Sequence, residues 1–347
     1  MPDLADRDVH NRPEQDNSGW LEQHREDVIE PDLPICDPHH HLWDWETHRY
    51  LLPDLLADLG SGHNVRSSVF IECTAMYRAD GPGSLRPLGE TEFVNGAAAM
   101  AASGRYGGVR ACAGIVGFAN LSLGAPVEAV LEAHRSAAGD RFKGVRHISA
   151  QDPSGTIRPA HTQPPPGLLG DARFREGFAR LRPLGLSFDA WLFHPQIPEL
   201  AALARAFPEQ PIVLNHAGGP LGVGPFRGQR EAIFPQWRKD MQALARCGNV
   251  QVKLGGLGMR VIGYDLHKRP WPPGSEELAR LWRPYIETCI DAFTPRRCMF
   301  ESNFPVDKVS GSYRVYWNAF KRLAAGASAE EKSALFHDTA AAFYRLV

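Results

Sequence analysis

Eight short apolar runs, separated by helix-like segments, constrain the fold of this chain more than any other feature. Each run is rich in β-branched residues and has the length of a buried strand. The runs are Ile35–His41, Ser67–Cys73, Val109–Gly117, Gly144–Ile148, Leu186–Phe193, Pro211–His216, Asn249–Leu254 and Arg297–Asn303. This alternation predicts a parallel sheet covered by helices, and 347 residues suit a (β/α)8 TIM barrel. A doubly wound open sheet is the alternative, but no Gly-x-Gly-x-x-Gly follows the first run.

The segments between the runs have helical periodicity. Apolar residues recur on one face of Val127–Ala138, Glu199–Phe207 and Glu276–Phe293. Ser328 and Glu331 form a capping box, which predicts the start of a last helix. We expect four residues of that helix to pack inward, namely Leu335, Ala342, Phe343 and Leu346.

Composition indicates an ordinary globular protein. The net charge of −2 gives no basic surface for nucleic acid or an anionic membrane, and no apolar run approaches the ~20 residues of a membrane span. Residues 1–30 lack the pattern of a signal peptide, and the six cysteines form no Cys-x-x-Cys pair. We therefore expect buried free thiols and a cytoplasmic location.

The domain division is expected to fall at residue 33. Residues 34–347 would form the barrel, and residues 1–33 an N-terminal extension. Trp20, Leu21, Val28 and Ile29 indicate that part of this extension packs against the barrel or against a neighbouring subunit of a homo-oligomer. A disordered tail is the alternative, given its charge.

Two histidines close the first run. In an extended strand, residues two apart point to the same side, so His39 and His41 of Asp37-Pro-His-His-His present two imidazoles to one spot. Such a pair is a simple way for a strand to hold a divalent ion. An apolar lead-in and an aromatic-rich turn flank the motif, which is typical of a strand ending at a site. A surface loop with incidental histidines is the alternative.

Polar side chains also end most of the other runs. They are Glu72, Arg146, His147, His194, His216, Lys253, Glu301 and Asn303. Active sites of such barrels lie at the carboxyl ends of the strands, and buried polar groups are costly unless they have partners. The pattern therefore predicts a site there. A structural ion pair between Lys253 and Glu301 is an alternative to a catalytic role for either residue.

Five motifs resemble those of one family. They are Asp-x-His-x-His-x-Trp-Asp at Asp37–Asp44, Gly-Val-Arg-His at Gly144–His147, Leu-Asn-His-Ala-Gly-Gly-Pro at Leu214–Pro220, Val-Lys-Leu-Gly-Gly at Val252–Gly256 and Phe-Glu-Ser-Asn-Phe-Pro-Val-Asp at Phe300–Asp307. From about Pro34 to the C-terminus, the chain is similar to amidohydrolase-related proteins. The most similar branch contains pyrone-dicarboxylate lactonase, sulfomuconolactone hydrolase and sugar lactonases.

The resemblance implies a (β/α)8 barrel hydrolase with a divalent metal, and zinc is the first candidate for that metal. His39, His41 and His216 are its implied ligands, and His194 stands where a fifth-strand ligand could lie. Asn303 departs from the pattern, because the family carries an aspartate there. An amide is neither a base nor an anionic ligand, so we expect the metal to be weakly held or absent.

We expect the substrate to be a small lactone, carboxylated or sugar-derived, opened by attack of water. Glu301 is the first candidate for the base and Glu72 the second, with Asn303 as the third candidate catalytic residue. Candidate substrate-binding residues are Arg146, His147, His194, Lys253 and Tyr77. The alternatives are a decarboxylase of unsaturated or aromatic acids, and a barrel that binds without catalysis.

Overall fold

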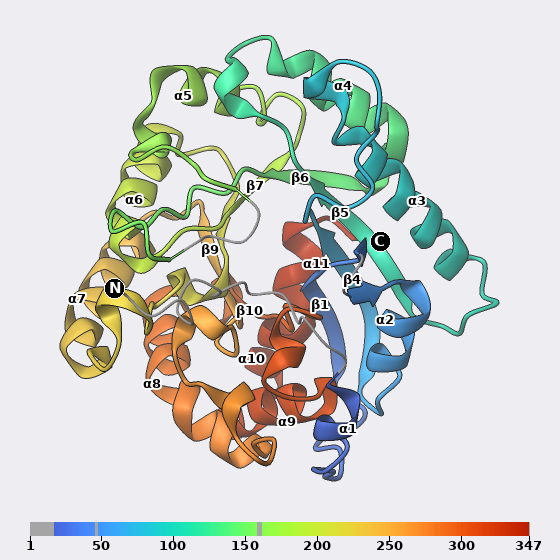
Figure 1. Ribbon diagram of the computed structural model, residues 1–347, viewed down its shortest axis with the longest axis vertical. Helices are drawn as coiled ribbons and strands as arrows, with labels where there is room; N and C mark the ends of the chain where they lie inside the picture. The colour runs from blue at the N-terminus through green and yellow to red at the C-terminus, as the bar shows by residue number, and fades with distance from the viewer. Residues whose placement is uncertain (1–16, 46–47, 158–161, 347) are drawn as a thin grey trace, which may run out of the picture.

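The expected barrel is present. The computed structural model describes residues 17–45, 48–157 and 162–346. Eight parallel strands pair in chain order and form a nearly closed barrel (Figure 1). They are β1 (Pro34–His40), β4 (Asn64–Ile71), β5 (Arg110–Gly117), β6 (Phe142–Arg146), β7 (Ser187–Ala190), β8 (Ile212–Leu214), β9 (Val250–Leu254) and β10 (Cys298–Phe300). Each falls within or overlaps one of the eight predicted runs.

Hydrogen bonds across the β1–β10 seam bring the first and last strands together. His41 N donates to Phe304 O at 2.8 Å, and Asn303 N donates to His39 O at 2.9 Å. Beneath them, the buried carboxylate of Asp37 accepts bonds from Ser302 N at 3.0 Å and Ser302 Oγ at 2.6 Å. The seam therefore aligns the ends of β1 and β10, where the predicted site residues stand.

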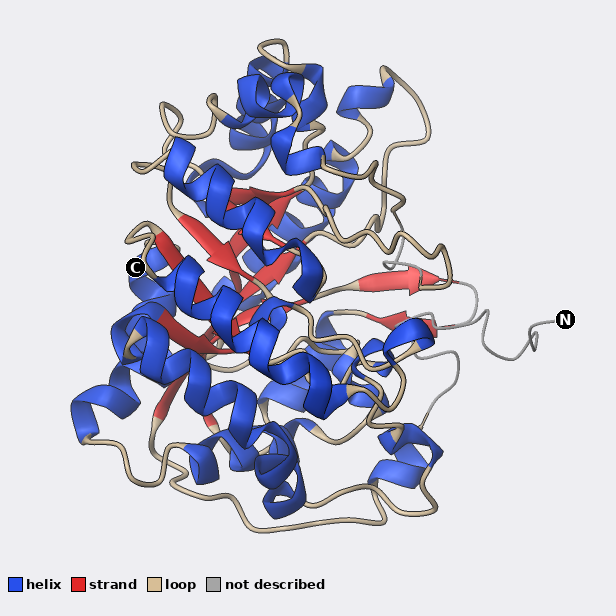
Figure 2. Ribbon diagram, turned by 90° about the vertical axis from the view of Figure 1, so that its left-hand side faces the viewer, coloured by secondary structure: helices blue, strands red, loops and turns tan. Residues whose placement is uncertain are grey.

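Helices form an outer layer around the strands (Figure 2). The α-helices are α1 (Ser18–Leu21), α2 (Leu52–Leu59), α3 (Leu88–Ala102), α4 (Val127–Ala138), α5 (Ala172–Phe178), α6 (Ile197–Ala206), α7 (Arg230–Ala245), α8 (Ser275–Phe293), α9 (Tyr313–Leu323), α10 (Ala329–Ser333) and α11 (Thr339–Phe343). Leu200, Leu203 and Ala204 of α6 are buried, as their spacing predicts. The predicted capping box opens α10, with Ser328 Oγ accepting from Glu331 N at 3.2 Å. None of the helices among the described residues could cross a membrane.

The last helix differs from its prediction in two respects. A π-helical turn, Ala334–Asp338, separates α10 from α11, and Ala342 is exposed. Leu335 is buried as predicted. At the end of α11, Phe343 points inward as predicted, and Tyr344 does so in place of Ala342. They pack with inward residues of the strands, namely Cys36, Val69, Ile71, Val116, Val213 and Met299. In the view of Figure 1, α11 overlaps the ring of strands, and Figure 2 shows the C-terminus at one end of them.

A two-stranded hairpin was not expected. β2 (Trp43–Trp45) and β3 (His48–Tyr50) pair antiparallel where the sequence indicated only an aromatic turn. The rings of Trp43 and Trp45 stack at 4.2 Å, and the Trp43 indole donates to His48 at 2.8 Å. All six cysteines are free and buried, as expected.

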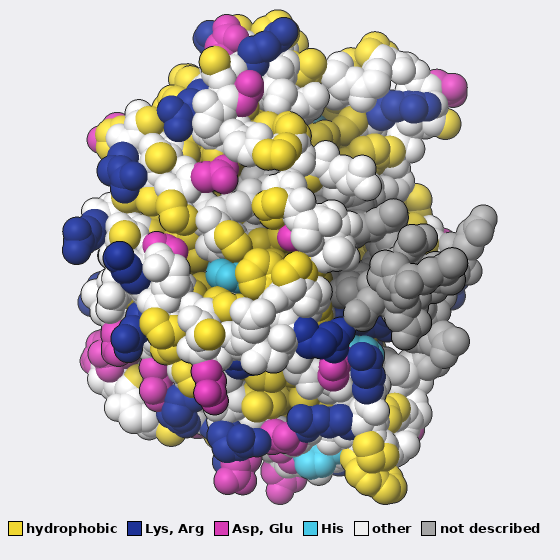
Figure 3. Space-filling model, turned by 60° about the vertical axis from the view of Figure 1, so that its left-hand side comes forward, with side chains coloured by type: hydrophobic (Ala, Val, Ile, Leu, Met, Phe, Trp, Pro, Cys, Tyr) yellow, Lys and Arg dark blue, Asp and Glu magenta, His cyan; other side chains and the backbone are white. Residues whose placement is uncertain are grey.

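The described part of the N-terminal segment, residues 17–33, packs against α8 and α9. Asn318 of α9 accepts a bond from Ile29 N at 2.8 Å and donates to Glu26 Oε1 at 3.0 Å. Glu26 Oε2 also accepts from Ser275 Oγ of α8 at 2.9 Å. Residues 1–16 of the expected extension lie outside the described residues. On the face shown in Figure 3, basic and acidic side chains are interspersed, so no extended surface of one charge is visible there.

Candidate active site

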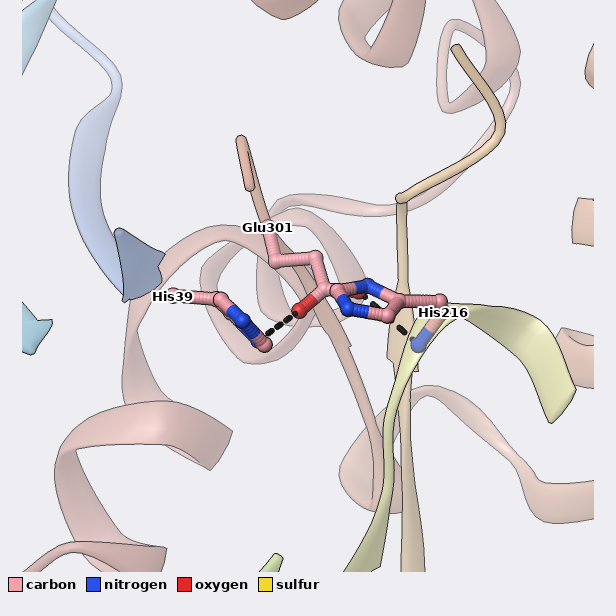
Figure 4. A group of neighbouring side chains, drawn as sticks. All are labelled: His39, His216 and Glu301. Atoms are coloured by element: carbon pink, nitrogen blue, oxygen red, sulfur yellow. Dashed lines mark hydrogen bonds and ion pairs between the residues drawn. The ribbon is translucent and has the colours of Figure 1, made fainter. Parts of the chain in front are cut away.

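Glu301 lies between two histidines at the carboxyl end of the barrel (Figure 4). Its Oε1 accepts hydrogen bonds from His216 Nδ1 at 2.7 Å and from His216 N at 3.0 Å. His39 Nδ1 lies 2.8 Å from Oε2. The pair is not aligned as a hydrogen bond, and Oε2 has no hydrogen-bond donor among the described residues. The three side chains are buried and come from three different strand ends.

Two glycines make room for this group. A Cβ on Gly255 would lie 2.3 Å from Glu301 O, and one on Gly256 would lie 2.4 Å from His216 Cγ. Gly256 also has a φ of +65°, which favours glycine. Any larger side chain at these two positions of the Val-Lys-Leu-Gly-Gly motif would clash with Glu301 or His216, which explains why both are glycines. His216 and Asn303 have φ values of 57° and 55°, so the backbone itself is strained around the site.

His41 completes the cluster of histidines. Its ring centroid lies 5.0 Å from that of His39, and the ring of His216 lies 4.5 Å from His39 on the other side. His41 Nδ1 donates to Ile71 O at 2.7 Å, which fixes its tautomer, and Nε2 lies 3.3 Å from Asn303 Oδ1. His39, His41 and His216 thus meet at one site, as their strand-end positions predict.

Asn303 is itself fixed by a buried acid. Its amide nitrogen donates to Asp307 Oδ2, and Asp307 Oδ1 accepts from Gly258 N at 2.6 Å. Burial raises the pKa of Asp307 to about 8. Asn303 therefore presents its carbonyl oxygen to His41, and the Asp307 carboxylate lies on the nitrogen side of the same amide.

Two buried cations flank the histidines. Arg146 Nη1 lies 3.5 Å from His39 Nε2, and Arg146 Nε donates to Glu72 Oε1 at 2.7 Å. Lys253 Nζ lies 3.3 Å from His39 Nδ1 and donates to Asp189 Oδ2 at 2.7 Å. The alternative of a Lys253–Glu301 ion pair is wrong, because Lys253 pairs with Asp189 and Glu301 contacts the histidines.

Burial controls the charge states at the site. It lowers the pKa of His39, which Lys253 lowers further, and that of His216, which Arg146 lowers further. It raises the pKa of Glu301 to about 8. The histidines are therefore neutral near pH 7, and a neutral imidazole is the form that binds a metal or donates a single proton.

Two of the expected substrate-binding residues, His147 and His194, make their hydrogen bonds outside the cluster. His147 accepts from Leu121 N at 3.3 Å and its ring packs edge-on against Phe118, outside the cluster. His194 accepts from Leu221 N at 3.2 Å. The Tyr77 hydroxyl is buried and has no hydrogen-bond partner among the described residues. We leave His147 and His194 out of the proposed site.

Sequence reasoning missed Asp189 and Tyr344. Asp189 is fully buried in β7 and also accepts a bond from the Tyr344 hydroxyl at 2.9 Å. A lone carboxylate within the apolar run Leu186–Phe193 was a usable signal, because a buried charge needs a partner. Tyr344 gave no such signal, since tyrosine is common in helix cores.

Comparison with known proteins agrees with the fold and with a hydrolase. A family model described as amidohydrolase matches residues 36–346. An uncharacterized protein of Sinorhizobium fredii, y4mH, is 35% identical over 91% of this chain and 99% of its own length. An L-fucono-1,5-lactonase of Burkholderia multivorans is 29% identical over 67% of this chain and 72% of its own.

A solved structure has the same architecture. It is an amidohydrolase from Burkholderia multivorans with bound zinc, 26% identical, with a TM-score of 0.68. The match covers 90% of this chain and 99% of that one. With the family model spanning the whole barrel and its motifs gathered at one strand end, this chain belongs to the amidohydrolase family of hydrolases.

Proposed function

We propose that this protein hydrolyses a small lactone, sugar-derived or carboxylated. The observation that carries the proposal is the Glu301 carboxylate held between His39 and His216, with Arg146 and Lys253 close to His39. The relative named as an L-fucono-1,5-lactonase supports a cyclic ester of a sugar acid as the substrate class.

The site fits a divalent metal. The ligand atoms of His39, His216 and Glu301 lie within 4.8 Å of one another, and Glu301 Oε2 has no hydrogen-bond donor among the described residues. Two imidazoles and a carboxylate are a set that zinc accepts. Bound there, the ion would polarise the lactone carbonyl and lower the pKa of a water molecule. The nearby cations Arg146 and Lys253 repel a further cation, in keeping with weak metal binding.

Glu301 is proposed as the group that moves the proton. In its ionised form, whose share increases as the pH rises toward and above its pKa of about 8, Glu301 accepts one proton from water as the water attacks the ring carbonyl, and a new C–O bond forms. When the ring C–O bond breaks, the same proton passes from Glu301 to the leaving alkoxide, so that the product is a hydroxy acid. His39 and His216 flank the carboxylate, one beside each of its oxygens, and keep it in place for both proton transfers.

The two cations stabilise the negative charge of the tetrahedral intermediate. Arg146 and Lys253 are fixed by their own carboxylates, Glu72 and Asp189, and are buried, so their field is poorly screened. Glu72 is therefore proposed as a partner of Arg146 rather than as the base. The Tyr77 hydroxyl, which lacks a partner among the described residues, is proposed to bind a substrate oxygen.

A lactone screen tests the proposal. Purified protein is assayed with aldono-1,5-lactones, including L-fucono-1,5-lactone, and with 2-pyrone-4,6-dicarboxylate, with added zinc or with a chelator. Acid release supports the proposal, while release of carbon dioxide from carboxylated substrates without acid release would replace it by the decarboxylase alternative. No turnover in any arm would favour a binding barrel.

Glu301→Gln is the matched variant. It removes the proton acceptor while keeping the size of the side chain, so we expect turnover to fall by about 100-fold or more, with little change in the melting temperature. Glu199→Gln on α6 makes the same substitution at a carboxylate that is only partly buried and has no hydrogen bond to the histidines, so it should keep full activity. Equal rates in wild type and Glu301→Gln would remove Glu301 from the mechanism.

A further inference from the structure

A chain of buried polar contacts leads from the C-terminal segment to the histidine cluster. The Tyr344 hydroxyl lies 2.9 Å from both carboxylate oxygens of Asp189. Asp189 Oδ2 accepts from Lys253 Nζ at 2.7 Å, and Lys253 Nζ lies 3.3 Å from His39 Nδ1. Tyr344, Asp189, Lys253 and His39 have no exposed surface, so every link is made between protein groups.

Asp189 also reaches the second histidine. Asn215 Nδ2 donates to Asp189 Oδ2 at 3.0 Å, and Asn215 immediately precedes His216. Lys253 donates at 2.8 Å to Pro38 O, immediately before His39. A single carboxylate therefore fixes groups next to both histidines that contact Glu301.

Tyr344 is held firmly at the base of this chain. Its ring packs with Cys36, Val69 and Met299 inside the barrel, and Lys253 Nζ lies 5.3 Å from the ring centroid. The next residue is fixed as well, since Lys143 Nζ donates to Arg345 O at 3.1 Å and Arg345 donates to Lys143 O at 3.2 Å. The hydroxyl thus has a defined place from which to orient Asp189.

We propose that Tyr344 is a positioning residue for the active site, which acts through Asp189 and Lys253 on His39. Its hydroxyl holds the Asp189 carboxylate in the orientation that directs Lys253 to His39. Only the kinetic test of this inference rests on the proposed function, because the imidazole of His39 can be observed by spectroscopy without any substrate.

Tyr344→Phe tests the proposal with minimal disturbance. The variant removes one oxygen and keeps the ring packing, and Asp189 retains its bonds to Lys253 and Asn215, so the fold should persist. The matched control is Tyr50→Phe. Tyr50 donates to Asp58 at 2.8 Å, Asp58 pairs with Lys308 at 2.8 Å, and Lys308 lies 5.5 Å from the Tyr50 ring. This triad has the same chemistry, but none of its members is in hydrogen-bond contact with a histidine of the cluster.

The substrate-free readout is the imidazole 15N spectrum of protein labelled on histidine. The His39 resonances are assigned by their loss in His39→Gln. Tyr344→Phe should shift them, and Tyr50→Phe should not. Unchanged His39 resonances in a folded Tyr344→Phe protein would overturn the proposal. So would equal shifts in both variants, which would indicate a general loosening.

The kinetic readout separates positioning from binding. With a lactone that the wild type hydrolyses, kcat of Tyr344→Phe should fall about tenfold while KM changes less than twofold. This is the effect expected of a residue that orients an active-site side chain without contacting the substrate. A rise in KM with unchanged kcat would contradict a role through His39. If no lactone is hydrolysed by the wild type, the proposed function fails, and the His39 spectrum still decides the role of Tyr344.

Discussion

Asn303 stands where the family resemblance implies an aspartate. Its amide lies between His41 Nε2 and the Asp307 carboxylate, donates through Nδ2 to Asp307 and adds no charge to the buried site. An aspartate in its place would stand beside Asp307 with Glu301 close by. Three neighbouring buried carboxylates are unfavourable unless a cation lies among them.

Asn303→Asp should therefore couple stability to metal. We expect a lower melting temperature than wild type in the presence of chelator, because a new buried charge lacks a counter-ion. Zinc should raise the melting temperature of the variant more than that of wild type, with about tenfold tighter binding, because an anionic ligand has been added. Thermal unfolding with zinc and with chelator measures both effects. Identical shifts in the two proteins would show that the amide does not limit metal binding.

Gly256 offers a second test at the scale of one residue. Gly256→Ala places a Cβ 2.4 Å from His216 Cγ at a φ of +65°, so either the ring or the backbone must move. We expect a loss of stability of roughly 1–3 kcal/mol and a large loss of activity. Gly96→Ala on α3, where no atom lies within 4 Å of the new Cβ, should gain roughly 0.5–1 kcal/mol. Chemical denaturation of both variants makes the comparison.

The sequence predicted which residues end the strands but not which partners they would take. His39, His216 and Glu301 could be placed at strand ends from local pattern alone, and they lie together. Lys253 could not be matched to Asp189, because the choice between two buried carboxylates depends on side-chain packing across the barrel. Tyr344 could not be found at all, since its place depends on the π turn before α11.

At the scale of elements, the strands were predictable and their lengths were not. The run Pro211–His216 forms a strand only at Ile212–Leu214, because Asn215 and His216 leave the sheet to face the site. The hairpin of β2 and β3 was missed because its register depends on ring stacking between Trp43 and Trp45. Hydrophobic periodicity predicts which residues are buried, but it does not predict which side chains stack on one another.

The amide of Asn318 makes three of the hydrogen bonds that hold the N-terminal segment to α9, and Lys321 Nζ adds another to Glu30 O at 2.8 Å. Asn318 accepts from Ile29 N and donates to Glu26 Oε1 and to Asp27 O at 2.8 Å. In Asn318→Ala these groups lose their partner, so we expect a loss of roughly 1–3 kcal/mol. Amide hydrogen exchange at residues 26–30 should increase, while exchange in β7 and β8 stays as in wild type. Uniformly faster exchange would instead indicate a global effect, and unchanged exchange would mean that other contacts hold the segment.

At the scale of the whole molecule, buried neutral histidines make stability depend on pH. Burial lowers the pKa of His63, His134, His147 and His194 from 6.5 to about 4. Between these values the unfolded chain binds protons that the folded protein does not. Stability is therefore full above pH 6.5 and falls as the pH drops toward 4.

His134 isolates one such contribution far from the site. It lies between Thr91 Oγ1 at 2.8 Å and Phe118 O at 3.1 Å, and stacks on Phe142 at 4.9 Å. Its share of the stability lost between pH 7 and pH 5 should be about 2 kcal/mol. His134→Gln should show a pH dependence flatter by that amount in urea denaturation at the two pH values. Parallel curves for variant and wild type would contradict the assignment.

The seam between β1 and β10 has a consequence for how the protein acquires activity. Ser302 and Asp37 are 265 positions apart, so their bonds form only when nearly the whole chain has been gathered. His39 and Glu301 sit directly beside that seam and cannot meet before it forms. During refolding, activity should therefore return only when β1 and β10 come together. Partly folded chains should be inactive even when their helices have already formed.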